Sequence, residues 1–156
     1  MKPQTEPEPA AVVESAAVRL LAGREHSRQE LARKLAIRGY PAGLIDRVLD
    51  DLARRRLLSD ERFAELYIAQ RSRKGYGPLR IRAELAERGV AGELASGWLA
   101  KADVDWDGLL ADLALRRFGE GPAADQRELG RRGRFLEQRG FPIALVRRYL
   151  DQSRPA

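Results

Sequence analysis

The residue types that most often carry catalysis are scarce in this chain of 156 residues, which contains no cysteine and a single histidine. A nucleophile activated by histidine would have to use His26. His26 directly precedes Ser27, whose type and position are typical of a helix N-cap, so we expect His26 to be an ordinary surface residue. The same composition excludes disulfides, thiol chemistry and the common zinc sites.

Carboxylate pairs and glycine-rich turns offer two further kinds of site. Asp50 and Asp51 are adjacent in a predicted helix and point about 100° apart, so they do not converge on one metal ion. The acidic group at residues 103–107 is more typical of a loop and the start of a helix. The turn GYGP at residues 75–78 lacks the Gly-Lys-Ser/Thr of a P-loop. We therefore expect no metal, no cofactor and no catalytic site, and a binding protein instead of an enzyme.

The charge balance is the strongest functional signal. The chain carries 29 lysine and arginine residues against 23 aspartate and glutamate residues, which gives a net charge of +6 and a pI near 10.1. Such an excess favours a polyanionic partner, either nucleic acid or an acidic protein surface. The simpler alternative is that a chain with 33% charged residues has well-solvated helix faces.

Two basic clusters provide the candidate partner-binding residues. Tyr76 lies between two glycines amid the first cluster and is the one aromatic side chain that we single out for contact. We expect Arg131 and Arg132, like Arg73 and Lys74, to lack acidic partners nearby and so to be available to a ligand. The first basic cluster consists of Arg71, Arg73, Lys74, Arg80, Arg82 and Arg88 around Tyr76, and the second consists of Arg127, Arg131, Arg132, Arg134 and Arg139.

Local signals predict short helices separated by glycine and proline. Ser27 and Glu30 form the S-x-x-E pattern of a capping box, and Gly39 ends the helix that follows. Pro41 then opens another helix whose apolar residues have the spacing of a buried stripe. Pro78 likewise suits the first position of a helix. No segment shows the alternation of a β-strand with hairpin turns, so we predict an all-α fold.

The most informative pattern is a repeat with an interval of about 50 residues. The sequence Leu-x-x-Arg-Gly occurs at residues 35–39, 85–89 and 136–140, and apolar positions of the same spacing follow each copy. We predict three tandem three-helix repeats in an elongated, curved array, which would join the two basic clusters into one positive stripe. The leading helices are expected at residues 12–22, 60–74 and 107–118, and the repeats at residues 11–56, 57–104 and 105–156.

The N-terminal residues and the distribution of apolar residues bear on location. Residues 1–10 are acidic and proline-rich, and we expect them to form a disordered tail. No apolar run approaches the roughly 20 residues that a membrane helix needs, and the start of the chain lacks the pattern of a signal peptide. We expect a cytoplasmic protein with no membrane partner.

Three stretches of the chain resemble one known family, the RecX regulators of the bacterial RecA recombinase. They are SRQELARKLAIRGY at residues 27–40, LLSDERFAELYIAQRSRKGYGPLRIRAELAERGV at residues 57–90, and RRGRFLEQRGFPIALVRRYL at residues 131–150. The resemblance implies three tandem three-helix repeats. It also implies a protein that lodges in the helical groove of the RecA filament on single-stranded DNA and, without chemistry of its own, restrains ATP hydrolysis, strand exchange and filament growth.

The same resemblance assigns residues to the interface. The basic motif of the family's second repeat matches Arg71, Arg73, Lys74, Gly75, Gly77, Arg80 and Arg82 here, and the basic run of its third repeat matches Arg131, Arg132 and Arg139. Gly97, inside the last predicted helix of the second repeat, departs from the pattern and leaves that helix boundary open. We expect a monomer.

A helix-turn-helix protein that binds DNA directly is the alternative, with the helix after Pro41 or Pro78 in a major groove. The acidic residues Asp46, Asp50 and Asp51 in the first of these helices weigh against it, because phosphates would repel them.

Overall fold

The computed structural model describes residues 8–156. The predicted tail at residues 1–10 therefore falls mostly outside the described residues. Its last two positions do not fit the prediction, because the first helix begins at Pro9 instead of residue 12. Proline suits this position, since the first residues of a helix have no intrahelical partner for their N–H groups.

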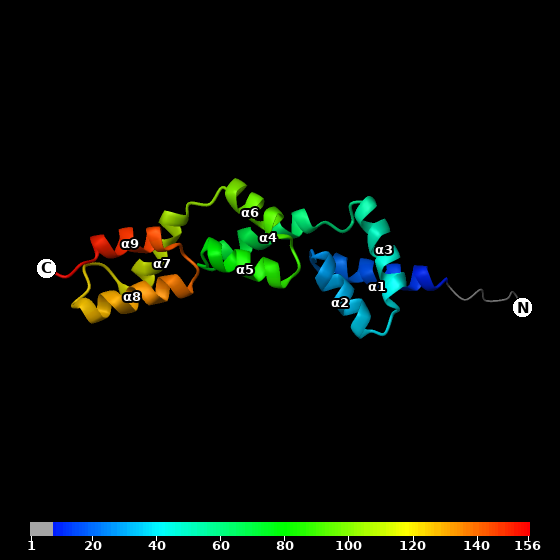
Figure 1. Ribbon diagram of the computed structural model, residues 1–156, viewed down its shortest axis with the longest axis horizontal. Helices are drawn as coiled ribbons and strands as arrows, with labels where there is room; N and C mark the ends of the chain where they lie inside the picture. The colour runs from blue at the N-terminus through cyan, green and yellow to red at the C-terminus, as the bar shows by residue number, and fades with distance from the viewer. Residues whose placement is uncertain (1–7) are drawn as a thin grey trace, which may run out of the picture.

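The described part of the chain forms nine helices and contains no strand, which confirms the all-α prediction. Figure 1 shows an elongated array in which three groups of three helices follow one another from the N-terminus to the C-terminus. The helices are α1 (Pro9–Gly23), α2 (Arg28–Ile37), α3 (Ala42–Arg54), α4 (Asp60–Arg73), α5 (Pro78–Glu87), α6 (Gly92–Lys101), α7 (Trp106–Phe118), α8 (Gln126–Gln138) and α9 (Ile143–Gln152).

The Leu-x-x-Arg-Gly sequences form the same helix ending three times. In each copy the glycine takes a left-handed conformation, with φ of 90° at Gly39, 79° at Gly89 and 95° at Gly140. The N–H of the next residue then bonds to the leucine carbonyl five positions back, over 3.4 Å, 3.0 Å and 3.2 Å respectively. All three leucines are fully buried. We call each ending an Arg-Gly corner, at residues 38–39, 88–89 and 139–140.

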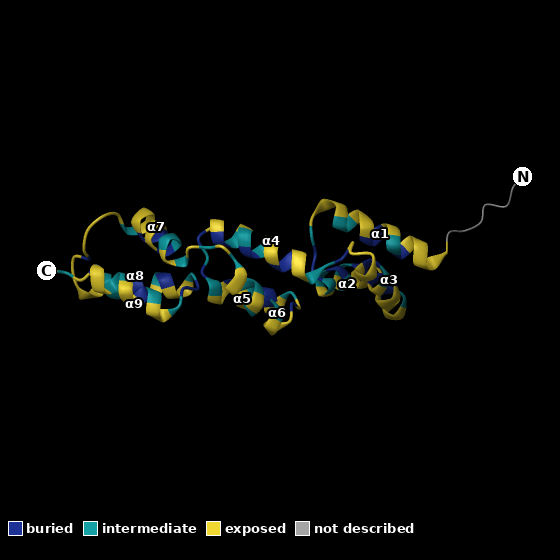
Figure 2. Cartoon of the chain, turned by 90° about the horizontal axis from the view of Figure 1, so that it is seen from above, coloured by how far each residue is buried: buried dark blue, intermediate teal, exposed yellow. Residues whose placement is uncertain are grey.

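Each group of three helices encloses its own hydrophobic core, and its buried residues are the dark blue segments of the chain in Figure 2. Leu58 precedes α4 but packs into the first core. Trp106, at the start of α7, packs against both the second and the third core. Near each predicted repeat boundary, between residues 56 and 57 and between residues 104 and 105, a single side chain thus packs into the core of the neighbouring repeat. These boundaries remain predictions.

Two local details differ from or clarify the predictions. The helix after Pro41, α3, ends at Arg54, two residues before the predicted end of the first repeat at residue 56, and Arg56 has a φ of 59°. The reason is that the N–H groups of residues 57 and 58 both bond to Leu52 O, which turns the chain so that Leu58 can be buried. Gly97 does not interrupt α6, which continues to Lys101. Nothing lies within 4 Å of the position of a Cβ on Gly97.

Consecutive groups join at the Arg-Gly corners. The Ser27 hydroxyl donates to Arg88 O over 2.6 Å. At the next junction the Gly77 N–H donates to Arg139 O over 2.8 Å, and the Leu79 N–H donates to Gly140 O over 3.0 Å. In both cases the corner that ends a middle helix meets the first turn of the preceding middle helix, as Figure 1 shows for α5 against α2 and α8 against α5.

Candidate partner-binding site

Tyr76 lies at the centre of a group of arginines between the second and third repeats. The guanidinium carbon of Arg71 is 3.8 Å from the centre of the Tyr76 ring, and those of Arg80 and Arg139 are each 4.5 Å from it. Cations at this distance are attracted by the ring face. The charge of Arg139 lowers the pKa of the Tyr76 phenol, although partial burial acts in the opposite direction. The structure thus joins members of both predicted basic clusters at one ring.

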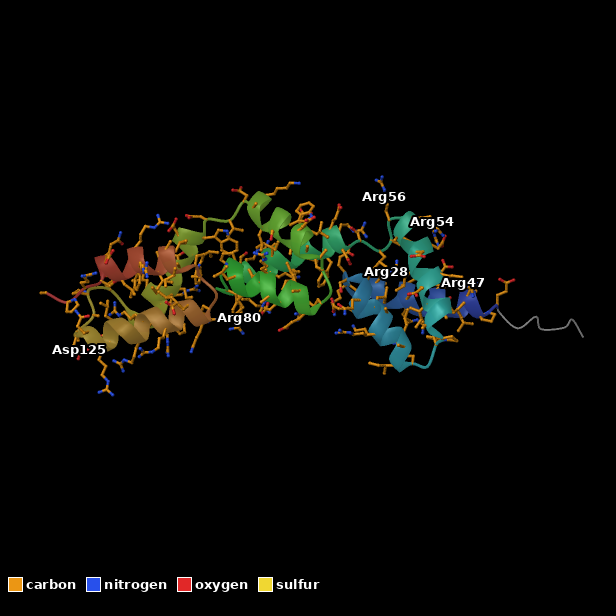
Figure 3. The ribbon with its side chains drawn as sticks, viewed as in Figure 1. Arg28, Arg47, Arg54, Arg56, Arg80 and Asp125 are labelled. Atoms are coloured by element: carbon orange, nitrogen blue, oxygen red, sulfur yellow. The ribbon has the colours of Figure 1, made fainter. Side chains whose placement is uncertain are left out.

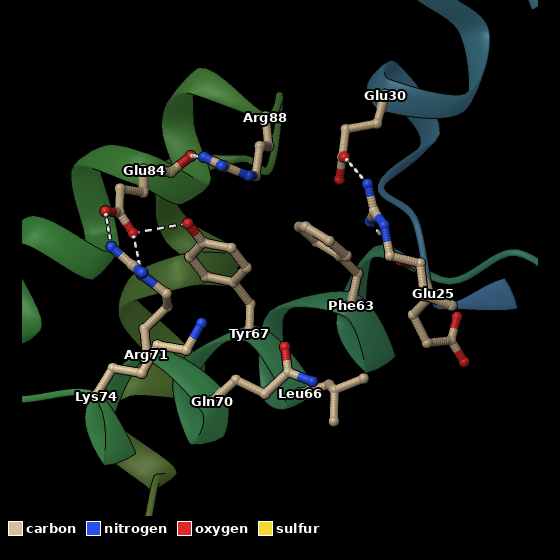
Figure 4. A pocket seen from close by; sticks show the side chains of 11 residues that line it. Glu25, Glu30, Phe63, Leu66, Tyr67, Gln70, Arg71, Lys74, Glu84 and Arg88 are labelled. Atoms are coloured by element: carbon tan, nitrogen blue, oxygen red, sulfur yellow. Dashed lines mark hydrogen bonds and ion pairs between the residues drawn. The ribbon is translucent and has the colours of Figure 1, made fainter. Parts of the chain in front are cut away.

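Glu84 neutralises part of this charge. Arg71 donates two hydrogen bonds to the Glu84 carboxylate, over 2.9 Å and 2.7 Å, and the Tyr67 hydroxyl donates a third over 2.7 Å, as Figure 4 shows. Arg80 adds a longer contact of 3.4 Å. Burial raises the pKa of the Glu84 carboxyl, but the bonds from Arg71 and Tyr67 outweigh it, so the pKa lies below its ordinary value. Arg71 and Arg80 are therefore partly committed to the fold.

Arg88 is also part of the internal framework. Its guanidinium lies 4.8 Å from the centre of the Tyr67 ring and donates to Glu84 O over 3.0 Å, while its carbonyl accepts the bond from Ser27. Burial, followed by the bond to Glu84, raises the pKa of the Tyr67 phenol to about 12. Glu84, on α5, precedes Arg88 by four residues, and the contact between them uses the backbone carbonyl of Glu84 instead of its carboxylate.

Arg132 is not available to a partner, and the expectation that it lacks an acidic neighbour is wrong. Its side chain is only 3% exposed and forms an ion pair of 3.0 Å with Glu128. It also donates to the Tyr149 hydroxyl and to Gly121 O, each over 3.2 Å. Glu128 precedes Arg132 by four residues and so shares its helix face. Arg132 therefore anchors the loop before α8 against α9.

Six predicted residues are exposed and form no salt bridge within the described residues. We call them the exposed basic set: Arg73, Lys74, Arg82, Arg127, Arg131 and Arg134. They come from α4, α5 and α8 and the residue that follows α4. Figure 3 shows charged side chains along the whole array, with Arg80 beside the junction of the second and third repeats and Asp125 at the far end of α8. These six are thus the exposed members of the two predicted clusters whose charge no ion pair of the fold neutralises.

Arg73 and Lys74, although adjacent, line different hollows. Lys74 borders a hollow of about 380 Å³ between the first two repeats, together with Arg24, Arg71 and other residues drawn in Figure 4. Arg73 borders a separate hollow of about 390 Å³ whose other side chains include Asp103, Asp105 and Asp112. The two residues were predicted to belong to one positive stripe, but acidic side chains border both hollows: Glu25, Glu30 and Glu84 the first, and the three aspartates the second.

His26 is buried, so the prediction of a surface residue is wrong. It is 1% exposed, with Nδ1 3.0 Å from Arg24 O and Nε2 2.7 Å from Lys34 Nζ. A lysine ammonium can only donate, so Nε2 accepts and the proton lies on Nδ1, which donates to the carbonyl. Burial lowers the pKa of His26, which is consistent with a neutral ring. Sequence spacing could not show that the residue before an N-cap packs beside Lys34.

Within residues 8–156, no three His, Cys, Asp or Glu side chains lie close enough together to hold a metal ion. No helix of the described chain is both long and apolar enough to cross a membrane.

The three consecutive groups of three helices define this protein as an all-α helical-repeat protein. Two family models match it: "RecX, first three-helix domain" over residues 15–52 and "RecX, second three-helix domain" over residues 59–97. The first range runs from α1 into α3, and the second runs from Ser59, the N-cap of α4, into α6. Relatives named "Regulatory protein RecX" cover most of the chain, and the chain belongs to the RecX family of regulatory proteins.

Two such relatives illustrate the similarity. The protein from Halorhodospira halophila (strain DSM 244 / SL1) is 47% identical over 135 residues, which are 86% of this chain and 84% of the relative. The protein from Pseudomonas savastanoi pv. phaseolicola (strain 1448A / Race 6) is 44% identical over 139 residues, which are 89% and 90% of the two chains.

Solved structures confirm the fold. A crystal structure of RecX from Lactobacillus salivarius matches with a TM-score of 0.79 at 20% identity and covers 92% of this chain and 97% of that one. A second crystal structure, of "regulatory protein RecX", matches with a TM-score of 0.80 at 21% identity and covers 92% of this chain and 72% of that one.

Proposed function

We propose that the protein regulates the RecA recombinase by binding the filament that RecA forms on single-stranded DNA. In this proposal it has no catalytic activity, and it restrains ATP hydrolysis, strand exchange and filament growth by occupying the filament groove. It acts as a monomer in the cytoplasm, where the filament forms. The observation that carries the proposal is the exposed basic set in a member of the RecX family.

The physical support comes from charge and shape together. Exposed arginines and lysines without an ionic partner in the fold attract acidic protein surface and phosphates from a distance. An elongated array distributes these cations over two of its three repeats, which suits a long polymer better than a small ligand. By contrast, Arg71, Arg80 and Arg88 mainly maintain the shape that presents the exposed basic set.

Fluorescence anisotropy of the labelled protein tests this function. We expect binding to preassembled RecA–DNA filament to be at least about tenfold tighter than binding to the same single-stranded DNA without RecA at equal salt. Equal affinity for naked DNA and filament would contradict the proposal and favour direct DNA binding. The alternative helix-turn-helix mode would show instead a preference for particular duplex sequences.

A further inference from the structure

The two junctions between repeats use one docking mode. At each junction the arginine carbonyl of an Arg-Gly corner faces the first turn of the preceding middle helix. A donor at the start of that helix forms a hydrogen bond with the carbonyl oxygen. The donor is the Ser27 hydroxyl for Arg88 O and the Gly77 N–H for Arg139 O. Ser27 and Gly77 are the N-cap residues of α2 and α5, so in both cases the corner docks at a helix whose N-cap residue is small.

The approach at both corners is close. A methyl group added at Gly89 would overlap the Gln29 side chain, and one added at Gly140 would overlap Arg80. At the facing side, one added at Gly77 would overlap the backbone of Gly140. Glycine is therefore needed at the corner both for its left-handed backbone and for the space that the docked helix takes.

The Arg38–Gly39 corner of the first repeat has the same backbone conformation, but no helix of the described residues docks against it. Among residues 8–156, no group donates to Arg38 O, and no atom lies within 4 Å of the position of a Cβ on Gly39. Ile37, the preceding residue, is 85% exposed, the highest value among the large apolar side chains described. The filled corners carry Glu87 and Gln138 at that position. Figure 1 places this corner at the outer end of α2, away from the second repeat.

A second copy of this chain does not offer a matching helix start at the other end of the array. Ser27 and Gly77 lie the same number of residues before the glycine of the corner that ends their own helix. The residue at that distance before Gly140, on α8, is Glu128. The helix begins earlier there, at Gln126, and the Glu128 N–H already donates to Asp125 Oδ1 over 2.8 Å. A second copy therefore meets no small N-cap residue at this position, unlike the two corners docked within the chain.

We propose that the Arg38–Gly39 corner, with Ile37 beside it, docks the first turn of a helix in the partner protein, at an N-cap that is Ser, Thr or Gly. The partner's cap donates to Arg38 O, and an apolar residue near that cap covers Ile37. This inference rests on the proposed function, since it takes the RecA filament as the partner that presents the helix. It adds an uncharged contact on the first repeat to the charged contacts on the other two.

The test measures anisotropy of the labelled full-length protein with preassembled RecA–DNA filament. Gly39→Asn places a side chain where the helix would dock, and asparagine tolerates a positive φ better than other non-glycine residues. The matched control is Gly121→Asn, because Gly121 has a φ of 92° and equally open surroundings. We expect Gly39→Asn to weaken filament binding at least about tenfold and Gly121→Asn to change it less than about twofold.

Ile37→Glu provides a second variant that leaves the backbone unchanged, with Ile143→Glu as its control on an exposed position of α9. We expect weaker filament binding only for Ile37→Glu. If wild-type protein does not bind the filament, the proposed function fails. If wild type binds and both Gly39→Asn and Ile37→Glu bind equally well, only the docking proposal fails. A dimer in sedimentation velocity that Gly39→Asn abolishes would overturn the proposed partner in favour of a second copy.

Discussion

The hydroxyl group of Ser27 donates a hydrogen bond of 2.6 Å to the carbonyl of Arg88, although 61 residues separate the two in the sequence. The same oxygen accepts from the Glu30 N–H over 3.1 Å and so caps α2. One fully buried serine therefore both starts a helix of the first repeat and holds the second repeat in place.

We predict that Ser27→Ala lowers the free energy of unfolding by about 2–3 kcal/mol, because the variant loses a cap and leaves the partly buried Arg88 carbonyl without its donor. Urea denaturation followed by circular dichroism measures the change. Ser59→Ala is the matched control, since Ser59 caps α4 through the Arg62 N–H but makes no bond to another repeat. It is expected to cost about 1 kcal/mol. Equal losses would show that the bond to Arg88 contributes nothing.

Glu84→Gln should destabilise the second repeat by about 1–3 kcal/mol, because Arg71 loses its charged partner and an amide cannot accept all the bonds that Glu84 accepts. Glu65→Gln, on an exposed and unpaired position of α4, should have almost no effect. The folded pKa of Glu84 lies below its ordinary value of 4.5. The stability that it contributes is therefore present above pH 4.5 and is lost as pH falls through the folded pKa. Urea titrations of wild type and Glu84→Gln should converge at low pH.

His26 predicts a separate pH dependence. Its pKa is lowered from 6.5 in the folded protein, so the unfolded chain takes up the proton first as pH falls. Stability should thus be level above pH 7 and should decrease below pH 6.5, by at most about 1.4 kcal/mol per pH unit. The carboxylates of Glu30 and Glu84 titrate below 4.5, outside this window.

The chain has no other histidine, so His26→Gln is a clean control. This variant should be less stable than wild type at pH 7 but should show no slope between pH 7 and pH 5. A wild-type protein that becomes more stable as pH falls from 7 to 5 would show that the ring is protonated in the fold.

Neutralising part of the exposed basic set should weaken filament binding without unfolding the protein. We expect the triple variant Arg73→Gln, Lys74→Gln, Arg82→Gln to bind RecA–DNA filament at least about tenfold more weakly, with unchanged helicity. The matched control neutralises Arg19, Arg33 and Arg47, which are exposed and unpaired in the first repeat and remove the same net charge. An equal loss in both variants would indicate a general effect of net charge instead of a defined surface.

The parts of the fold that local sequence determines could be predicted, and the parts that depend on contacts between helices could not. The Leu-x-x-Arg-Gly pattern predicted three equal helix endings because a left-handed glycine and a buried leucine act within six residues. The capping box of Ser27 was equally local. Its bond to Arg88 was not, and neither was the pairing of Arg71 with Glu84, which lie on different helices.

The candidate site shows the same limit. Arginine-rich segments identified where the positive charge lies, but the sequence did not separate Arg132, which is buried against Glu128, from its neighbour Arg131, which is exposed. Which arginine faces inward depends on how α8 is rotated against α9, and that rotation is set by packing across the repeat. Tyr76 was singled out because it lies between two glycines in a basic segment. The three guanidinium groups around its ring come from α4, from α5 and from Arg139, the residue that follows α8.

An electron-microscopy reconstruction of RecA–DNA filaments saturated with this protein would show whether it occupies the filament groove. We predict density for all three repeats along that groove, with Lys74, Arg82 and Arg131 facing RecA or the enclosed DNA. Filaments with an empty groove, or a bound protein whose exposed basic set faces solvent, would contradict it.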